Sequence, residues 1–139
     1  QVSYHKRKPV EGSPYLYTES VHGLAQWADF LIVTVAGGEQ TRHLIDANVL
    51  DALGPTAFLI NVARGSVVDE RALVHALQDG RIAGAGLDVY EDDPRPYPGL
   101  EAMDNVVLAP HIGSGTHATR HAMADWVLEN IRTWPPVVR

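Results

Sequence analysis

Cysteine is absent from the 139-residue sequence, which excludes disulfide bonds, thiolate metal ligands and cysteine nucleophiles in this chain. The sequence also lacks an apolar run long enough to cross a bilayer and a basic-then-apolar leader, so no membrane partner is expected. The formal net charge of −6 argues against nucleic acid as a general partner. With these classes set aside, a cytoplasmic globular domain is the default expectation.

Apolar runs and amphipathic segments alternate along the chain. We expect strands at residues 2–5, 29–36, 57–62, 83–89 and 105–109, and helices at 20–28, 47–53, 69–78 and 116–134. Strands that alternate with helices predict an α/β fold with a mostly parallel, doubly wound sheet. The continuous apolar run at 29–36 is typical of a strand that is buried on both faces.

The last predicted helix is the longest, and we expect it to end at Pro135-Pro136. It carries an apolar stripe, which indicates a position in the core or at an interface. The stripe consists of Met123, Trp126, Val127, Ile131 and Trp134. His117 and His121 lie one turn apart on this helix, a spacing that can bind zinc. No third ligand is evident, so we favour a solvated polar face and expect no metal.

Three polar side chains stand at the ends of three successive predicted strands. Arg64 follows the strand at 57–62, Asp88 lies at the end of the strand at 83–89, and His111 follows the strand at 105–109. Ligand sites in open α/β sheets lie at the carboxyl ends of the strands. The sequence therefore predicts one site that contains an arginine, an acid and a histidine.

The segments INVARGSVVDERAL, AGAGLDVYEDDP and NVVLAPHIGS carry these three side chains. Together they resemble the family of D-isomer-specific 2-hydroxyacid dehydrogenases, and the resemblance extends over essentially the whole chain. Within the family the likeness is greatest to glyoxylate/hydroxypyruvate reductases, through YHKRKP, ALGPTAFLINVARGSVVDE and AMDNVVLAPHIGSGT. The resemblance implies an oxidoreductase that uses a nicotinamide cofactor to reduce a small 2-oxo acid to a D-2-hydroxy acid.

The resemblance assigns the catalytic roles to Arg64 and His111. The guanidinium of Arg64 is suited to the carboxylate and carbonyl of a 2-oxo acid, and His111 is the acid/base that gives a proton to the carbonyl oxygen. Asp93 stands where the family usually has a glutamate that pairs with the histidine, and it is one methylene shorter. Three alternatives stay open: Asp93 pairs with His111, Glu91 replaces it, or neither carboxylate reaches the imidazole.

The cofactor assignments also follow from the resemblance. NAD-specific domains place an acid after their second strand, whereas here the basic residues His5, Lys6 and Arg7 stand there, followed by Lys8. We therefore expect NADP, with NAD as the alternative; Arg7 is the main candidate for the 2′-phosphate, and a solvated basic turn is the competing interpretation. Asp88 is expected near the nicotinamide carboxamide, unless it only binds backbone amides at its strand end. The family runs backbone along the cofactor at the positions of Val62 and Gly113.

The sequence has no G-x-G-x-x-G motif, the glycine turn that binds the pyrophosphate. In terms of the family, residues 1–139 are an incomplete nicotinamide-dinucleotide-binding domain without its first strand, and the substrate domain is absent. The first strand is central in the order 3-2-1-4-5-6, so we expect either that a strand of another copy fills the gap or that residues 1–17 are displaced.

We accordingly interpret the chain as a fragment of a reductase that is inactive by itself. Two alternatives are a dinucleotide-sensing module like that of corepressors and an inert truncated remnant. Exposed strand edges and the family resemblance lead us to expect a homodimer.

Overall fold

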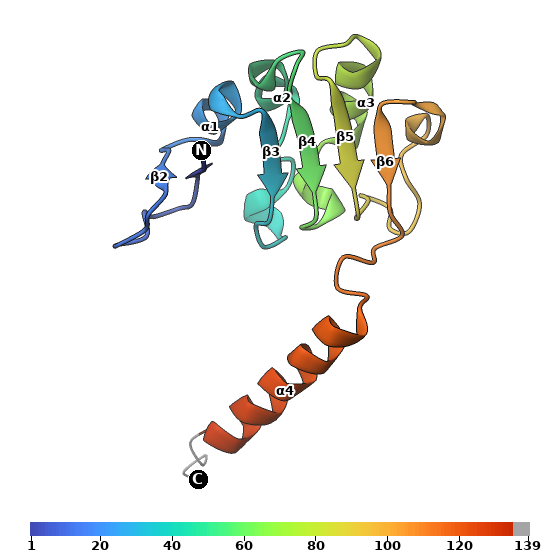
Figure 1. Cartoon of the computed structure of the whole chain (residues 1–139). Coiled ribbons are helices and arrows are strands. Elements are labelled where there is room, and N and C mark those ends of the chain that lie inside the picture. Colours follow the sequence, from blue (N-terminus) through green and yellow to red (C-terminus); the bar gives the residue numbers. More distant parts are fainter. Residues whose placement is uncertain (135–139) are drawn as a thin grey trace.

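The structure is a computed structural model that describes residues 1–134, and it contains two parallel β-sheets with helices (Figure 1). The strands are β1 (Ser3–Tyr4), β2 (Leu16–Tyr17), β3 (Phe30–Val33), β4 (Phe58–Asn61), β5 (Gly84–Leu87) and β6 (Val106–Leu108). The helices are α1 (Val21–Trp27), α2 (Ala47–Leu53), α3 (Glu70–Gln78) and α4 (His117–Thr133), with short 3₁₀ turns at Glu39–Thr41, Gly65–Val67 and Leu100–Ala102. The predicted α/β class is confirmed, and β2 is the one strand that the sequence analysis missed.

Each helix begins at a side chain that caps its first turn. Ser20, Asp46, Asp69 and Thr116 each accept a hydrogen bond from the backbone N–H three residues later. Such caps satisfy donors that have no partner within the helix. Their short-range chemistry explains why the predicted starts of the helices agree with the structure to within a residue or so.

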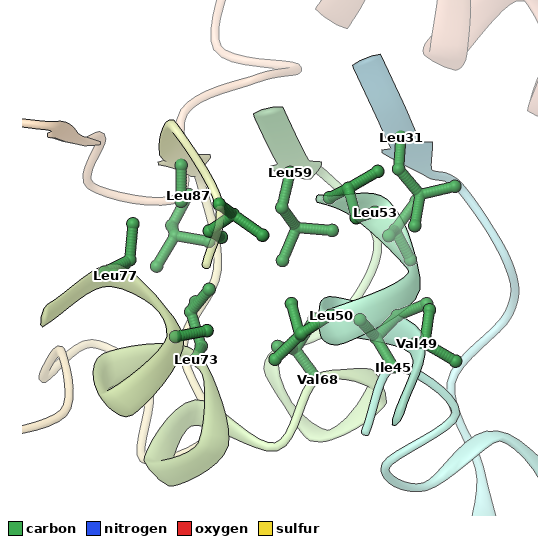
Figure 2. Close-up of a cluster of buried hydrophobic side chains, with 14 of the residues drawn as sticks. Leu31, Ile45, Val49, Leu50, Leu53, Leu59, Val68, Leu73, Leu77 and Leu87 are labelled. Atoms are coloured by element: carbon green, nitrogen blue, oxygen red, sulfur yellow. The ribbon is translucent and has the colours of Figure 1, made fainter. Parts of the chain in front are cut away.

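The core lies against one face of the main sheet, and many of its side chains are leucine or valine (Figure 2). The sheet has the order β3-β4-β5-β6, and α2 and α3 cover this face. Leu31 and Leu59 point from the strands toward Leu50 of α2 and Leu73 of α3, and all four are at most 4% exposed. Burial of each such side chain contributes roughly 1.5–3 kcal/mol, so this layer determines where the ends of the strands lie.

The opposite face of the main sheet is open among the described residues. Phe30, Ile32 and Val107 are 61%, 59% and 72% exposed, and Phe30 stacks on the neighbouring Phe58 with 5.3 Å between ring centroids. The prediction that the strand at 29–36 is buried on both faces is therefore wrong for this structure. The reason is that no element of residues 1–134 packs against this side.

An apolar groove of about 660 Å³ separates the two sheets. Residues of β1 line one side of it, and residues of β3 line the other. It lies where the order 3-2-1-4-5-6 places the central strand, which explains why the expected doubly wound sheet is interrupted there. Because β1 and β3 border the same groove, residues 1–17 are not displaced from the sheet; a strand of another copy in the gap stays a prediction.

Helix α4 extends away from the rest of the chain (Figure 1). Its predicted stripe is exposed along its whole length, with Trp126 and Trp134 both 71% exposed, so the stripe is not part of the core of the described residues. The predicted stop at Pro135-Pro136 lies outside the described residues. Within residues 1–134, no helix is both long and apolar enough to cross a membrane.

Candidate active site

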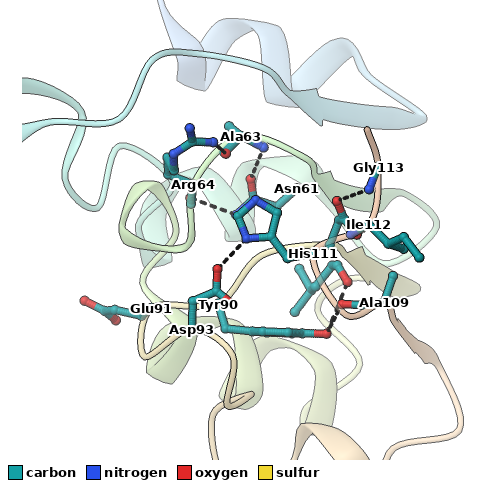
Figure 3. A network of polar contacts seen from close by, with 12 residues as sticks. Asn61, Ala63, Arg64, Tyr90, Glu91, Asp93, Ala109, His111, Ile112 and Gly113 are labelled. Carbon is teal, nitrogen blue, oxygen red and sulfur yellow. Dashed lines mark hydrogen bonds and ion pairs between the residues drawn. The ribbon is translucent and has the colours of Figure 1, made fainter. Parts of the chain in front are cut away.

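The ends of three neighbouring strands bring the candidate residues together (Figure 3). In the register of the sheet, Asn61 of β4 pairs with Leu87 of β5, and Leu87 pairs with Leu108 of β6. The parallel strands therefore end in one row, and the segments that carry Arg64, Asp93 and His111 leave the same edge of the sheet. This is the edge at which ligands bind in open α/β folds.

Arg64 stands on a turn that the buried side chain of Asn61 builds. The Asn61 amide donates to the Arg64 carbonyl and accepts from the Ala63 backbone N–H, both at 3.1 Å. One guanidinium nitrogen of Arg64 donates to the Ala63 carbonyl at 2.6 Å, and the side chain passes so close to Gly37 that a Cβ there would lie 2.7 Å from the Arg64 Cγ. The guanidinium is exposed, and most of its five N–H donors are left for a ligand.

His111 is bonded to Asp93. The distance from His111 Nδ1 to Asp93 Oδ2 is 2.5 Å, and the two side chains are 46% and 35% exposed. Glu91 points elsewhere: its Oε1 binds Arg42 Nη2 at 2.7 Å and His43 Nε2 at 2.8 Å. Of the three alternatives for this position, the geometry agrees with the first, because the shorter aspartate reaches the imidazole. Within residues 1–134, no hydrogen bond engages His111 Nε2.

Both carboxylate oxygens of Asp88 bind the segment that follows His111. Oδ1 accepts from the Ile112 N–H at 2.7 Å, and Oδ2 accepts from the Gly113 N–H at 2.8 Å. A Cβ at residue 113 would approach Asp88 Oδ2 to 2.8 Å, so glycine suits this contact. These are the backbone contacts of the alternative interpretation of Asp88, and contact with nicotinamide stays a prediction. Val62 is 48% exposed at the same edge of the sheet.

The basic residues after β1 form an exposed turn. The His5 imidazole is turned inward, and its Nδ1 lies 2.9 Å from the Thr18 carbonyl oxygen. Arg7 reaches Gln40 at 3.3 Å, and within residues 1–134 no acid forms an ion pair with Lys6, Arg7 or Lys8. Lys6 and Arg7 are thus available to an anion, and cofactor contact by His5, Lys6 and Arg7 stays a prediction.

Two buried polar side chains that sequence reasoning missed support the site. Glu70 is 2% exposed and accepts from the Glu91 backbone N–H at 2.9 Å, while burial raises the pKa of its carboxyl above the ordinary value. Tyr90 is 5% exposed and donates to the Ala109 carbonyl at 2.6 Å; burial, followed by the charge of Asp88, raises its pKa. The sequence offers little indication that Glu70 is buried, because an acid in the first turn of a helix is usually solvated.

Metal ligands do not gather in the described part of the chain, where no group of three or more histidine or acidic side chains could hold an ion. His117 and His121 both lie on the exposed α4.

A parallel α/β sheet with an arginine and a histidine–carboxylate pair at adjacent strand ends is the arrangement of a nucleotide-dependent oxidoreductase domain. The sequence family agrees: residues 1–113 match the model of the D-isomer specific 2-hydroxyacid dehydrogenase NAD binding domain. The chain belongs to this family.

Individual relatives cover the chain almost completely. The glyoxylate/hydroxypyruvate reductase A HPR2 of Arabidopsis thaliana is 47% identical over 94% of this chain, and the 2-ketogluconate reductase of Gluconobacter oxydans is 44% identical over the same share. The NADPH-dependent glyoxylate/hydroxypyruvate reductase of Sinorhizobium meliloti, solved with NADP and malonate, superposes on 97% of the chain with a TM-score of 0.87 and 48% identity. The chain spans about 42% of the length of these relatives.

Proposed function

We propose that this chain is the nicotinamide-binding part of an NADPH-dependent reductase that converts a small 2-oxo acid of the glyoxylate or hydroxypyruvate type into a D-2-hydroxy acid. The observation that supports it most directly is the His111–Asp93 pair, which shares a strand-end edge with the exposed Arg64. This pair favours an enzyme over a dinucleotide-sensing binding module, because ligand sensing does not need a proton donor.

Arg64 binds the substrate in this proposal. A 2-oxo acid has a carboxylate beside its carbonyl group, and the planar guanidinium can donate to both with parallel hydrogen bonds. Among the described residues 1–134, its one hydrogen bond is to the Ala63 carbonyl. The turn that Asn61 holds keeps the guanidinium at the edge of the sheet.

His111 gives the proton in this proposal. Asp93 accepts the hydrogen bond from Nδ1–H, which leaves the second proton of the imidazolium on Nε2, facing the site. When bound, the reduced nicotinamide supplies a hydride to the carbonyl carbon, and His111 Nε2–H protonates the carbonyl oxygen. The Asp93 carboxylate stabilises the positive charge on the imidazole before the transfer and orients the ring.

Two parts of the chain fit the ends of a dinucleotide. Lys6 and Arg7 are exposed after β1, next to His5, and form no ion pair within residues 1–134. A 2′-phosphate would be recognised at this position. Val62, Asp88 and Gly113 lie at the strand ends near His111 and are proposed to contact the nicotinamide half. The solved Sinorhizobium relative contains NADP, which supports NADP over NAD as the preferred cofactor here.

We also propose that residues 1–139 do not turn over by themselves and that the functional protein is a homodimer. The pyrophosphate turn is missing from the sequence, and the groove between β1 and β3 is open. The first test is oxidation of NADPH and NADH by the 139-residue chain with glyoxylate and hydroxypyruvate. We expect no turnover; measurable turnover would refute the inactivity of the isolated chain.

The second test uses the full-length gene product and the same assay. We expect His111→Ala to lower kcat by roughly 10²–10⁴-fold, as loss of a general acid does. Arg64→Ala should raise KM and lower kcat together. Arg7→Ala should raise the KM for NADPH and leave that for NADH nearly unchanged, with Lys8→Ala as the matched control on the same turn. A His111→Ala enzyme with near-normal kcat would overturn the proposed function.

A further inference from the structure

Glu70 is a buried acid that the proposed chemistry does not use. It lies in the first turn of α3 at 2% exposure, and no ion pair joins it to a cation within residues 1–134. A buried carboxylate without a cation is unfavourable unless hydrogen bonds compensate for the lost hydration. The groups that bind Glu70 should therefore explain why its carboxylate is buried.

The groups that stabilise the Glu70 carboxylate belong to the segment that carries Asp93. Glu70 Oε1 accepts from the backbone N–H of Glu91 at 2.9 Å. Just after Glu91 the chain makes a tight turn around Asp93, in which the Arg95 N–H donates to the Asp92 carbonyl at 2.8 Å. Glu70 thus binds the segment two residues before Asp93.

The base of this segment is attached to the two other parts of the site. A Cβ at Gly65 would overlap the Tyr90 carbonyl, so the turn that follows Arg64 packs directly against the segment. The Tyr90 hydroxyl donates to the Ala109 carbonyl, two residues before His111. These contacts hold residue 90 in place, and the hydrogen bond from the Glu91 N–H to Glu70 fixes the next residue.

The hydrogen bond between His111 and Asp93 cannot fix the position of Asp93 by itself. Both side chains are partly exposed, and ion pairs of this kind are weak because water competes for them. An aspartate is also short, so its backbone must be placed closely for Oδ2 to stay 2.5 Å from the imidazole. The position of Asp93 therefore depends on its neighbours in the chain, which are held by the Glu70–Glu91 hydrogen bond before it and by the buried Leu100 after it.

We propose that Glu70 is a positioning residue: its carboxylate holds the backbone at Glu91 so that Asp93, two residues on, stays bonded to His111 Nδ1 and Nε2 faces the substrate. The importance of this position for catalysis rests on the proposed function, whereas the positioning itself is a property of the 139-residue chain. The two can therefore be tested separately.

The structural test observes the His111 imidazole in the 139-residue chain by ¹⁵N NMR. In the wild type, we expect a protected Nδ1–H proton and a Nδ1 shift typical of a hydrogen bond to a carboxylate; Asp93→Asn should change both. Glu70→Ala should speed exchange of that proton by roughly 10- to 100-fold, the equivalent of one lost charged hydrogen bond. The control is Glu101→Ala, which removes an exposed acid and should leave the signal unchanged.

A folded Glu70→Ala chain with the wild-type Nδ1–H signal would overturn the proposal. If Glu70→Ala does not fold, Glu70→Gln keeps the shape and replaces one acceptor oxygen with a donor, so it should still weaken the signal. Amide exchange in the wild type gives a measurement without any variant: the Glu91 amide, which donates to Glu70, should exchange more slowly than that of Asp93. Equally fast exchange of the two amides would also overturn the proposal.

The functional test uses the full-length gene product. Glu70→Ala should lower kcat while leaving the KM for the 2-oxo acid nearly unchanged, because Arg64 still binds the substrate. A purely structural role would reduce the amount of folded enzyme without changing kcat per active site, and that result would overturn the positioning role. If Asp93→Asn has full kcat, the proposed role of the pair fails, but the NMR signal still decides what Glu70 does.

Discussion

Replacement of Asn61 by alanine tests how the turn that carries Arg64 is built. Asn61 is 1% exposed, and its amide makes two hydrogen bonds of 3.1 Å, to the Arg64 carbonyl and from the Ala63 N–H. Ala63 is 6% exposed, so water cannot replace the acceptor that the Ala63 N–H loses. Arg64 is exposed, so the Arg64 carbonyl lies closer to solvent. One buried donor without a partner costs about 1–3 kcal/mol, and the vacated volume adds to this.

We therefore expect Asn61→Ala to lower the free energy of unfolding by about 2–4 kcal/mol, a large part of the stability of a small domain. Urea unfolding of the 139-residue chain, followed by circular dichroism, measures this difference. The matched control is Asn48→Ala on α2. The Asn48 amide makes an exposed contact of 3.3 Å to Asp46, so its loss should change the free energy of unfolding by less than about 0.5 kcal/mol. Equal stabilities for the two variants would refute the argument that Asn61 builds the turn.

Three other predictions concern pH, self-association and the edge of the sheet. Because burial raises the pKa of Glu70, the folded state binds its proton more tightly, so stability should fall as pH rises from the ordinary glutamate pKa through the raised one. The difference in unfolding free energy between wild type and Glu70→Gln, measured by urea titration at several pH values, should show this slope; a flat difference would contradict it. Phe30→Ser on the open face should weaken any self-association by roughly tenfold or more in sedimentation equilibrium, with Val10→Ser as control, and a monomeric wild type at every concentration would contradict the homodimer. Gly113→Ala should displace the Asp88 contact and shift the Ile112 amide resonance; an unchanged spectrum would show that the segment has room for a Cβ.

The sequence by itself determined the local structure and the residues available for chemistry. Capping side chains and glycine stops act over a few residues, so α1, α2 and α3 begin and end close to where the patterns placed them. The alternation of strands and helices predicted the parallel sheet, and the predicted strand ends placed Arg64 and His111 at one edge of it, as the structure has them. The sequence also predicted either that a strand of another copy fills the groove between β1 and β3 or that residues 1–17 are displaced; β1 lines the groove, and a strand of another copy stays a prediction.

Only the tertiary structure decided which polar groups meet. Asp93 meets His111 across 18 positions of the chain, and the Glu91 N–H meets the Glu70 carboxylate across 21. The contacts of Asp88 with the Ile112 and Gly113 amides, and those of Glu91 with Arg42 and His43, depend on the same kind of long-range packing. Short-range patterns cannot encode such distances, because they follow from how whole elements pack.

The exposed surfaces were also decided by the fold. Phe30 and Ile32 read as core residues in the sequence, and the stripe of α4 read as buried or at an interface. In residues 1–134 both are exposed, because burial requires a second element opposite the apolar side chain, and an interface at the α4 stripe stays a prediction. The sequence shows which side chains are apolar and therefore favour burial. The elements that surround each side chain in the fold determine whether it is buried.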